Sequence, residues 1–178
     1  MSTFRGFVVV SGPPASGKST VASALAAELD LPLFAKDVVK DALVYALGAP
    51  DLPRSRELGR AAVHVLLAVA ATAGRGVLES VWHGYARAPL AALPGPTVEV
   101  FCRCDPEVLQ ARYAARSTSR GAGYFDAERS AAELWNDEVG APVAAGWPVL
   151  AVDSGTEVDI AALARAVTAA ARVAEPSR

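Results

Sequence analysis

The chain has 178 residues, of which 52% are hydrophobic and 20% are charged. This composition excludes a disordered chain, because it supplies enough apolar side chains for a core, and the length fits one compact domain. The formal net charge of −2 gives no overall basic character of the kind that binds long nucleic acids, so such a partner is not expected.

Short apolar runs and helical periodicity alternate along the chain. Strands are expected at residues 6–10, 31–35, 76–80, 97–103 and 148–152. Helices are expected at residues 18–28, 37–47, 54–73, 105–116, 127–138 and 158–174, with a short helix or irregular stretch at 85–93. This alternation is typical of an α/β fold with a parallel sheet between helical layers. Because no linker divides the sequence, one domain over residues 1–178 is expected.

The hydrophobic segments indicate no membrane association. The N-terminal run leads directly into a glycine-rich motif, unlike a signal peptide. The longest apolar stretch, residues 61–74, is shorter than a membrane span and contains His64, which is expected to be packed or at the core boundary. Cys102 and Cys104 are expected as reduced thiols in a buried strand, with a metal or redox pair as the alternative. A cytoplasmic protein is therefore expected.

Residues 12–19 match the pattern G-x-x-x-x-G-K-[ST] in full, between a predicted strand and a predicted helix. In this motif backbone N–H groups and the helix N-terminus face phosphate oxygens. Lys18 is expected to reach the β- and γ-phosphates and to act in catalysis, and the Ser19 hydroxyl to bind magnesium. A chance glycine-rich turn is the alternative. The expected nucleotide-binding residues here are Gly12, Pro13, Pro14, Ala15, Ser16, Gly17, Lys18, Ser19 and Thr20.

The sequence GPPASGKST, followed by a strand and then KDVVKDAL, resembles the small AAA-type P-loop kinases. This group includes gluconate-type kinases, chloramphenicol phosphotransferase and polynucleotide kinase. The resemblance spans most of the chain and is specific at the P-loop and at the lid. It implies a P-loop NTPase fold, a three-layer sandwich whose five-stranded parallel sheet has the order 2-3-1-4-5, with a small lid. It also implies ATP as the phosphoryl donor and Mg²⁺ as the metal.

An aspartate at the start of the helix after the second strand acts as the base in the resembled kinases, and Asp37 matches it. Phosphoryl transfer needs a carboxylate within hydrogen-bond reach of the acceptor hydroxyl. A helix N-cap is the alternative role for Asp37, and Asp41 is the rival carboxylate. Polynucleotide kinase has a basic residue three positions later. Lys40 occupies that position here and is expected at the substrate.

Further candidates lie between residues 54 and 85. Glu79 ends a predicted strand on the ligand-binding edge of the sheet. It is expected to hold magnesium through water or to bind the substrate, with a local structural role as the alternative because a plain Walker-B sequence is absent. Trp82 and His83 are expected to line the acceptor pocket, although a loop histidine is also typical of an ordinary exposed position. Arg60 is expected to bind an anionic or polar acceptor.

Arg112, Arg116 and Arg120 recur every four residues and would share one face of a helix. A triphosphate would relieve their mutual repulsion, whereas a solvated basic face is the alternative. In the resembled kinases the lid carries an R-x-x-x-R pair, which Arg112 matches on the adenine side and Arg116 at the phosphates, where an arginine stabilises the transition state. Arg120 is expected as a third nucleotide-binding arginine. The lid is expected at about residues 117–128.

These features predict an enzyme that moves the γ-phosphoryl group of ATP to a hydroxyl of a small molecule, such as a metabolite, a sugar or an antibiotic. The expected catalytic residues are Asp37, Lys18 and Arg116. Two alternatives stay open: a kinase for the 5′-hydroxyl of nucleosides, nucleotides or polynucleotides, and a regulatory ATPase that has no acceptor.

Overall fold

A computed structural model describes residues 4–117 and 121–174 of the chain. Its centre is a parallel sheet of five strands in the order β2-β3-β1-β4-β5. The strands are β1 (Phe7–Ser11), β2 (Leu33–Ala35), β3 (Gly76–Glu79), β4 (Thr97–Arg103) and β5 (Val149–Asp153). The α/β fold class and the predicted strand order are therefore confirmed.

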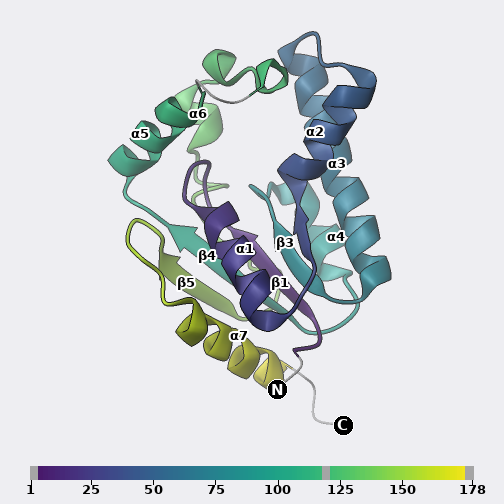
Figure 1. Ribbon diagram of the computed structural model, residues 1–178, viewed down its shortest axis with the longest axis vertical. Coiled ribbons are helices and arrows are strands. Elements are labelled where there is room, and N and C mark those ends of the chain that lie inside the picture. The colour runs from purple at the N-terminus through teal and green to yellow at the C-terminus, as the bar shows by residue number, and fades with distance from the viewer. Residues whose placement is uncertain (1–3, 118–120, 175–178) are drawn as a thin grey trace.

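Helices cover both faces of this sheet (Figure 1). They are α1 (Lys18–Leu29), α2 (Lys36–Leu47), α3 (Leu52–Ala73), α4 (Arg87–Ala91), α5 (Pro106–Ser117), α6 (Ala131–Leu134) and α7 (Ile160–Ala174). Short 3₁₀ turns are η1 (Gly84–Ala86), η2 (Ala122–Tyr124) and η3 (Asp126–Glu128). No helix in the described ranges is both long enough and apolar enough to cross a membrane.

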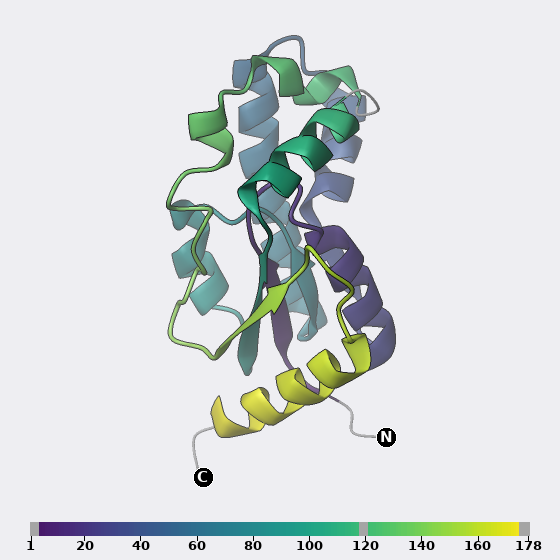
Figure 2. The same ribbon diagram turned by 90° about the vertical axis from the view of Figure 1, so that its left-hand side faces the viewer.

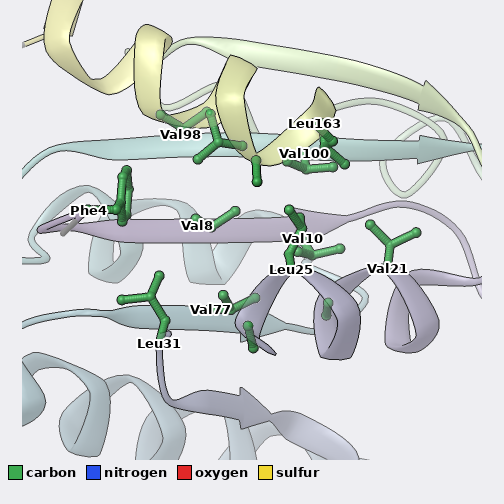
Figure 3. Packing of buried hydrophobic residues seen from close by; sticks show 14 of the residues in the cluster. Phe4, Val8, Val10, Val21, Leu25, Leu31, Val77, Val98, Val100 and Leu163 are labelled. Atoms are coloured by element: carbon green, nitrogen blue, oxygen red, sulfur yellow. The ribbon is translucent and has the colours of Figure 1, made fainter. Parts of the chain in front are cut away.

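Alternate residues of the strands fill two separate hydrophobic layers, as the period of two in a strand requires. Val8 and Val10 of β1 point to the layer shared with α1 and α7, where Leu25 and Leu163 pack against them (Figure 3). Phe7 and Val9 point to the opposite layer, which is closed by α3 and α4. This alternation produces the three-layer sandwich.

A buried carboxylate, missed in the sequence, fixes a loop against this sheet. Glu99 in β4 is fully buried and accepts hydrogen bonds from the Ser11 hydroxyl (2.6 Å) and the Val143 and Ala144 amides (2.7 and 2.9 Å). A fourth bond comes from the Trp147 indole (3.1 Å). Ser11 ends β1 and directly precedes the P-loop. Glu99 therefore joins the loop of residues 143–147 to the end of β1 and the start of the P-loop.

The continuous helix predicted at residues 127–138 is wrong, because only Ala131–Leu134 is α-helical and η3 ends at Glu128. Arg129 has an extended backbone, and its side chain donates to the Tyr124 carbonyl. At the other end, the Trp135 indole donates to the Pro14 carbonyl, and Asn136 bonds the Glu133 carbonyl. Side-chain hydrogen bonds to the backbone thus flank the short helix on both sides, and the bond to Pro14 is long-range.

The carboxyl ends of three neighbouring strands meet at one edge of the sheet. Glu79, the last residue of β3, is in register with Val10 of β1 and with Ala35 of β2. The P-loop follows β1, and Asp37 comes two residues after Ala35. This register brings the phosphate-binding motif, Glu79 and Asp37 to the same edge, as ligand sites in open α/β sheets require.

The chain around η2 and η3 lies above this edge, between α5 and the α2–α3 pair (Figure 1 and Figure 2). This segment contacts the α2–α3 pair directly. The Ser55 hydroxyl of α3 donates to the Gly123 carbonyl at 2.6 Å. The Tyr124 hydroxyl donates to the Asp41 carboxylate of α2, also at 2.6 Å. Residues 121–128 therefore cover the region where the strands end.

Candidate active site

The P-loop curls because three of its residues have a left-handed backbone. Gly12, Ala15 and Gly17 have φ angles of 134°, 65° and 82°. At Gly12 a side chain is also excluded by space, since a Cβ atom would lie 2.5 Å from the Cys102 carbonyl oxygen. Ala15 adopts a backbone that costs most side chains about 1 kcal/mol or more, and the surrounding loop holds it there.

Lys18 is buried at the start of α1, and its ammonium donates to the Pro13 carbonyl at 2.7 Å. The pKa of Lys18 is lowered to about 8, mainly by burial and in part by the Arg116 charge, while the Glu79 and Asp37 charges oppose the shift. The Lys18 ammonium therefore interacts electrostatically with Glu79, Arg116 and Asp37. The predicted phosphate-binding lysine lies at the centre of the charged groups.

A cavity of about 640 Å³ opens beside the P-loop. Among the residues predicted from the sequence, it is lined by Pro14, Ala15, Gly17, Lys18, Ser19, Thr20, Asp37, Lys40, Arg60, Glu79, His83, Arg112 and Arg116. Gly12, Pro13 and Ser16 are buried in the P-loop behind these residues. Arg120 lies outside the described residues, as does part of the predicted lid. The structure therefore gathers most of the predicted nucleotide and acceptor residues around one space.

Asp37 lies in the first turn of α2, but it does not cap this helix. The N-cap residue is Ala35, which makes no side-chain cap bond. The Asp37 carboxylate instead forms an ion pair with the Lys36 ammonium at 2.9 Å and lines the cavity. Asp37 is therefore not the N-cap residue of α2, and it forms part of the cavity lining.

Glu79 lies on the cavity floor next to Ser19. Burial raises the pKa of the Glu79 carboxyl, whereas the Lys18 charge and the Ser19 hydroxyl oppose this rise. A hydroxyl beside a carboxylate is an oxygen donor set that suits Mg²⁺, which takes few protein ligands and keeps water and phosphate oxygens. Among residues 4–117 and 121–174, no three His, Cys, Asp or Glu side chains are grouped to hold a metal by themselves.

Trp82 is not part of the cavity wall, which corrects its predicted role. Its side chain is 4% exposed and packs in the core with Phe7 and Leu78. The indole N–H donates to the Val10 carbonyl at 3.1 Å. The large apolar ring is buried, and its one polar atom finds a backbone partner, as buried tryptophans usually do.

His83 does line the cavity, together with Tyr85. Its Nδ1 lies 3.0 Å from one carboxylate oxygen of Glu138. The other oxygen of this carboxylate accepts from the Gly84 amide at 2.8 Å. His64 was expected to be packed or at the core boundary, but it is exposed on α3, with its ring 6.2 Å from that of Tyr85. No sequence pattern indicated Glu138.

Lys40 borders the cavity, and its ammonium contacts residues of α3 and of the segment above the cavity. The side chain is 2% exposed, and the ammonium donates to the Ser55 hydroxyl at 2.8 Å. It also lies 4.2 Å from the centre of the Tyr124 ring, a cation–π contact. Through Ser55 and Tyr124, Lys40 joins α2 and α3 to residues 123 and 124 above the cavity, and its predicted substrate contact stays a prediction.

The sequence analysis did not predict several residues that line the cavity and bond to one another across it. Arg56 of α3 binds the Glu133 carboxylate with two nitrogens, at 2.8 and 3.3 Å, and Arg129 binds the same carboxylate at 2.7 Å. The Tyr113 hydroxyl of α5 donates to the buried Asp126 at 2.9 Å. These bonds connect both sides of the cavity to the segment that covers it.

A second cavity of about 440 Å³ adjoins the first on the α5 side. Arg112 lines both cavities, and it donates to the Ser154 carbonyl at 3.1 Å, in the turn that follows β5. Gly17 and Thr20 of the P-loop complete the shared boundary. The two cavities therefore meet beside the P-loop, at Gly17, Thr20 and Arg112.

Neither cysteine takes part in a disulfide bond. Cys102 is buried in β4, and burial raises the pKa of its thiol to about 12. Cys104 lies just beyond the end of β4 and is half-buried. The prediction of a reduced, buried thiol is confirmed for Cys102.

Comparison with solved structures supports the fold. A protein described as a proposed kinase from Chloroflexus aurantiacus has 29% identity and a TM-score of 0.82, over 95% of this chain and 99% of that one. A gluconokinase from Sinorhizobium meliloti has 21% identity and a TM-score of 0.60, over 97% and 95%. A shikimate kinase from Acinetobacter baumannii, solved with shikimate, has 14% identity and a TM-score of 0.58, over 93% and 92%. No curated protein matches the chain.

The model of an AAA domain family, AAA_33, matches residues 7–142. This range contains the P-loop, Asp37, Glu79 and both described lid arginines, Arg112 and Arg116. The predicted resemblance to the small P-loop kinases is confirmed, and the protein belongs to the AAA_33 family.

Proposed function

We propose that this protein is a kinase that transfers the γ-phosphoryl group of ATP to a hydroxyl of a small molecule. One observation carries the proposal: the Asp37 carboxylate and the P-loop lysine Lys18 line the same cavity, close enough for their charges to interact. A protein that only bound or hydrolysed a nucleotide would not need a second carboxylate on the acceptor side of the phosphates. The solved relatives include kinases for small hydroxyl compounds.

The donor would lie across the two cavities. Its triphosphate fits against the inward backbone of residues 12–19 and the start of α1, where N–H groups and the helix dipole favour negative charge. Its base fits the second cavity between Arg112 and the turn at Ser154. Arg116, whose charge acts on Lys18, is placed to meet the phosphates.

The acceptor would occupy the part of the first cavity between α2, α3 and the end of β3. In the proposed reaction, Asp37 accepts the proton of the acceptor hydroxyl, whose oxygen forms a bond to the γ-phosphorus. The bond between the γ-phosphorus and the β–γ bridging oxygen breaks, and ADP leaves. The Lys36 ammonium lies 2.9 Å from this carboxylate.

Ser19 and Glu79 are the residues that would hold magnesium, the first directly and the second through water. The bound ion would neutralise phosphate charge. The Glu79 carboxylate is kept next to Ser19 by the register between β3 and β1.

We also propose that residues 117–128 act as a lid within a single kinase domain. The described part of this segment already covers the strand ends and is bonded to α2 and α3. A covered cavity would keep water from competing with the acceptor for the phosphoryl group.

The test is an acceptor screen with Mg-ATP and the purified protein, using sugars, sugar acids, nucleosides, aminoglycosides, amphenicols and 5′-hydroxyl oligonucleotides. ATP consumption should rise above background with one class. Asp37→Asn should reduce this transfer by about 10²–10⁴-fold and leave the ATP dissociation constant nearly unchanged. Glu28→Gln, at an exposed carboxylate of α1 outside both cavities, is the control. Equal activity of Asp37→Asn and the unmodified protein would refute the role of Asp37, and tight ATP binding with no acceptor response would favour a regulatory ATPase.

A further inference from the structure

The acceptor side of the cavity has a wall built from three separate parts of the chain. Arg60 comes from α3, His83 and Tyr85 from the segment after β3, and Glu138 from the segment after α6. The rings of His83 and Tyr85 are nearly parallel, with an angle of 14° and 6.0 Å between centres. The wall therefore combines a cation, a carboxylate–imidazole pair and a flat aromatic surface.

The carboxylate of this wall is already bonded. One Glu138 oxygen accepts from the Gly84 amide at 2.8 Å and the other lies 3.0 Å from His83 Nδ1. These two bonds, the histidine first, lower the pKa of Glu138, so it stays ionised. The other cavity carboxylate on this side, Glu133, is bound by Arg56 and Arg129. Asp37 and Glu79 also line this cavity, and none of these four carboxylates forms an ion pair with Arg60 among the described residues.

Arg60 differs from the other arginines of α3. Arg54 is paired with Glu57 at 3.0 Å, and Arg56 with Glu133 at 2.8 Å. Within residues 4–117 and 121–174, Arg60 forms no hydrogen bond or ion pair, although it lines the cavity. Its charge nevertheless acts there: burial raises the pKa of Tyr85, and Arg60 opposes that rise.

The His83–Glu138 pair can supply a hydrogen-bond acceptor to this wall, in addition to the donors of Arg60. When Nδ1–H donates to the carboxylate, the ring is held in one orientation, and Nε2 is left as an acceptor. An acceptor hydroxyl can donate to Nε2, while a guanidinium offers two parallel N–H groups that match the oxygens of a carboxylate or a phosphate. The wall therefore suits a molecule that carries both a hydroxyl and a compact oxyanion.

We propose that the phosphoryl acceptor is an anionic hydroxyl compound, a hydroxy acid or a phosphate ester, whose oxyanion binds Arg60 and whose second hydroxyl is oriented by His83 and Glu138. This inference rests on the proposed kinase function and names the substrate class of the same cavity. Arg60 is the specificity-determining residue, and Glu138 is a positioning residue that acts through His83.

Direct binding tests the subsite without depending on catalysis. The protein is first loaded with Mg-ADP, which fills the P-loop, and is then titrated by calorimetry with glycerate, glycerol 3-phosphate and glycerol, and with gluconate and glucitol. At least one anion should bind about tenfold more tightly than its neutral counterpart. Carboxylates and phosphates are compared directly, so the same titrations identify which oxyanion the subsite takes.

Arg60→Gln should remove that preference, and Arg60→Lys should restore part of it. Arg54→Gln is the matched control, because Arg54 is on the same helix, exposed and outside the cavity lining. Equal binding of anionic and neutral compounds, absence of binding by every anion, or a preference that survives Arg60→Gln would each overturn the inference.

Turnover separates this inference from the proposed function. With an anion that the enzyme phosphorylates, Arg60→Gln should raise KM about tenfold or more with little change in kcat. Glu138→Gln should change the KM of acceptors with two hydroxyls more than it changes the KM of acceptors with one hydroxyl. Asp37-dependent phosphorylation of a neutral compound, unaffected by Arg60→Gln, would leave the kinase function standing and refute the anionic class. Anion binding that depends on Arg60 without any transfer would support the subsite and refute the kinase.

Discussion

The Lys18 ammonium donates to the Pro13 carbonyl at 2.7 Å, so the P-loop lysine is held by the backbone of its own loop. This bond satisfies one donor of a buried cation while Arg116 and the burial itself disfavour the charge. A phosphate oxygen that replaced the carbonyl would be a stronger partner, because it carries a negative charge. Nucleotide binding is therefore linked to the protonation of Lys18.

We expect ATP affinity to fall as the pH rises above about 8, the pKa of Lys18. In the free protein Lys18 loses its proton above this pH, whereas bound phosphates raise the pKa and keep the ammonium charged. Binding must then take up a proton, which costs about tenfold in affinity per pH unit until the pKa of the complex is reached. Calorimetric titration at pH 7 to 9.5, in buffers of different ionisation enthalpy, measures both quantities.

Lys18→Met is the control for this pH dependence. It should bind ATP more weakly at every pH and show no proton uptake in this range. An affinity for the unmodified protein that is constant from pH 7 to 9.5 would show that Lys18 keeps its proton, contrary to this prediction.

We expect Glu99→Gln to lower the free energy of unfolding by roughly 2–4 kcal/mol. Glu99 is fully buried and accepts four hydrogen bonds, including those from Ser11 and the Trp147 indole. The amide has one oxygen fewer, and its NH₂ group would face donors. Urea denaturation measures the change. Glu28→Gln, at an exposed position of α1, should stay within about 0.5 kcal/mol of the unmodified protein, and an equal loss in both variants would contradict the role given to Glu99.

We expect Ser55→Ala to loosen the segment above the cavity. The Ser55 hydroxyl donates to the Gly123 carbonyl at 2.6 Å and accepts from Lys40 at 2.8 Å, so its loss leaves both groups without this partner. Amide hydrogen exchange in residues 121–126 should become roughly tenfold faster, which corresponds to about 1–2 kcal/mol in local opening. Thr72→Ala, which removes an exposed hydroxyl from the same helix, should leave exchange in this segment unchanged.

We also expect more frequent opening of the proposed lid to increase transfer of the phosphoryl group to water relative to transfer to the acceptor. In Ser55→Ala, the background hydrolysis without acceptor should rise relative to acceptor-dependent turnover, because water reaches the phosphoryl group more easily. Faster exchange without any change in this ratio would mean that the contact to Gly123 stabilises the fold but does not control access.

The sequence alone determined the order of strands and helices, the P-loop and the position of Asp37. These features depend on local rules: strand and helix periods, the glycine positions of residues 12–19, and the fact that a helix after a parallel strand starts at the ligand edge. Arg112 and Arg116 also needed only the spacing of a helix, which places them on one face of α5 toward the cavities.

Only the tertiary structure decided which side chains reach the cavity and which hold it together. Trp82 and His83 are neighbours in sequence beyond the end of β3, yet one is buried in the core and the other lines the cavity. Glu99 and Glu138 are each fixed by donors 44 or more residues away. The short helix within the predicted range 127–138 is flanked by bonds to Tyr124 and Pro14. Contacts between distant segments leave no periodic signal, so local patterns cannot reveal them.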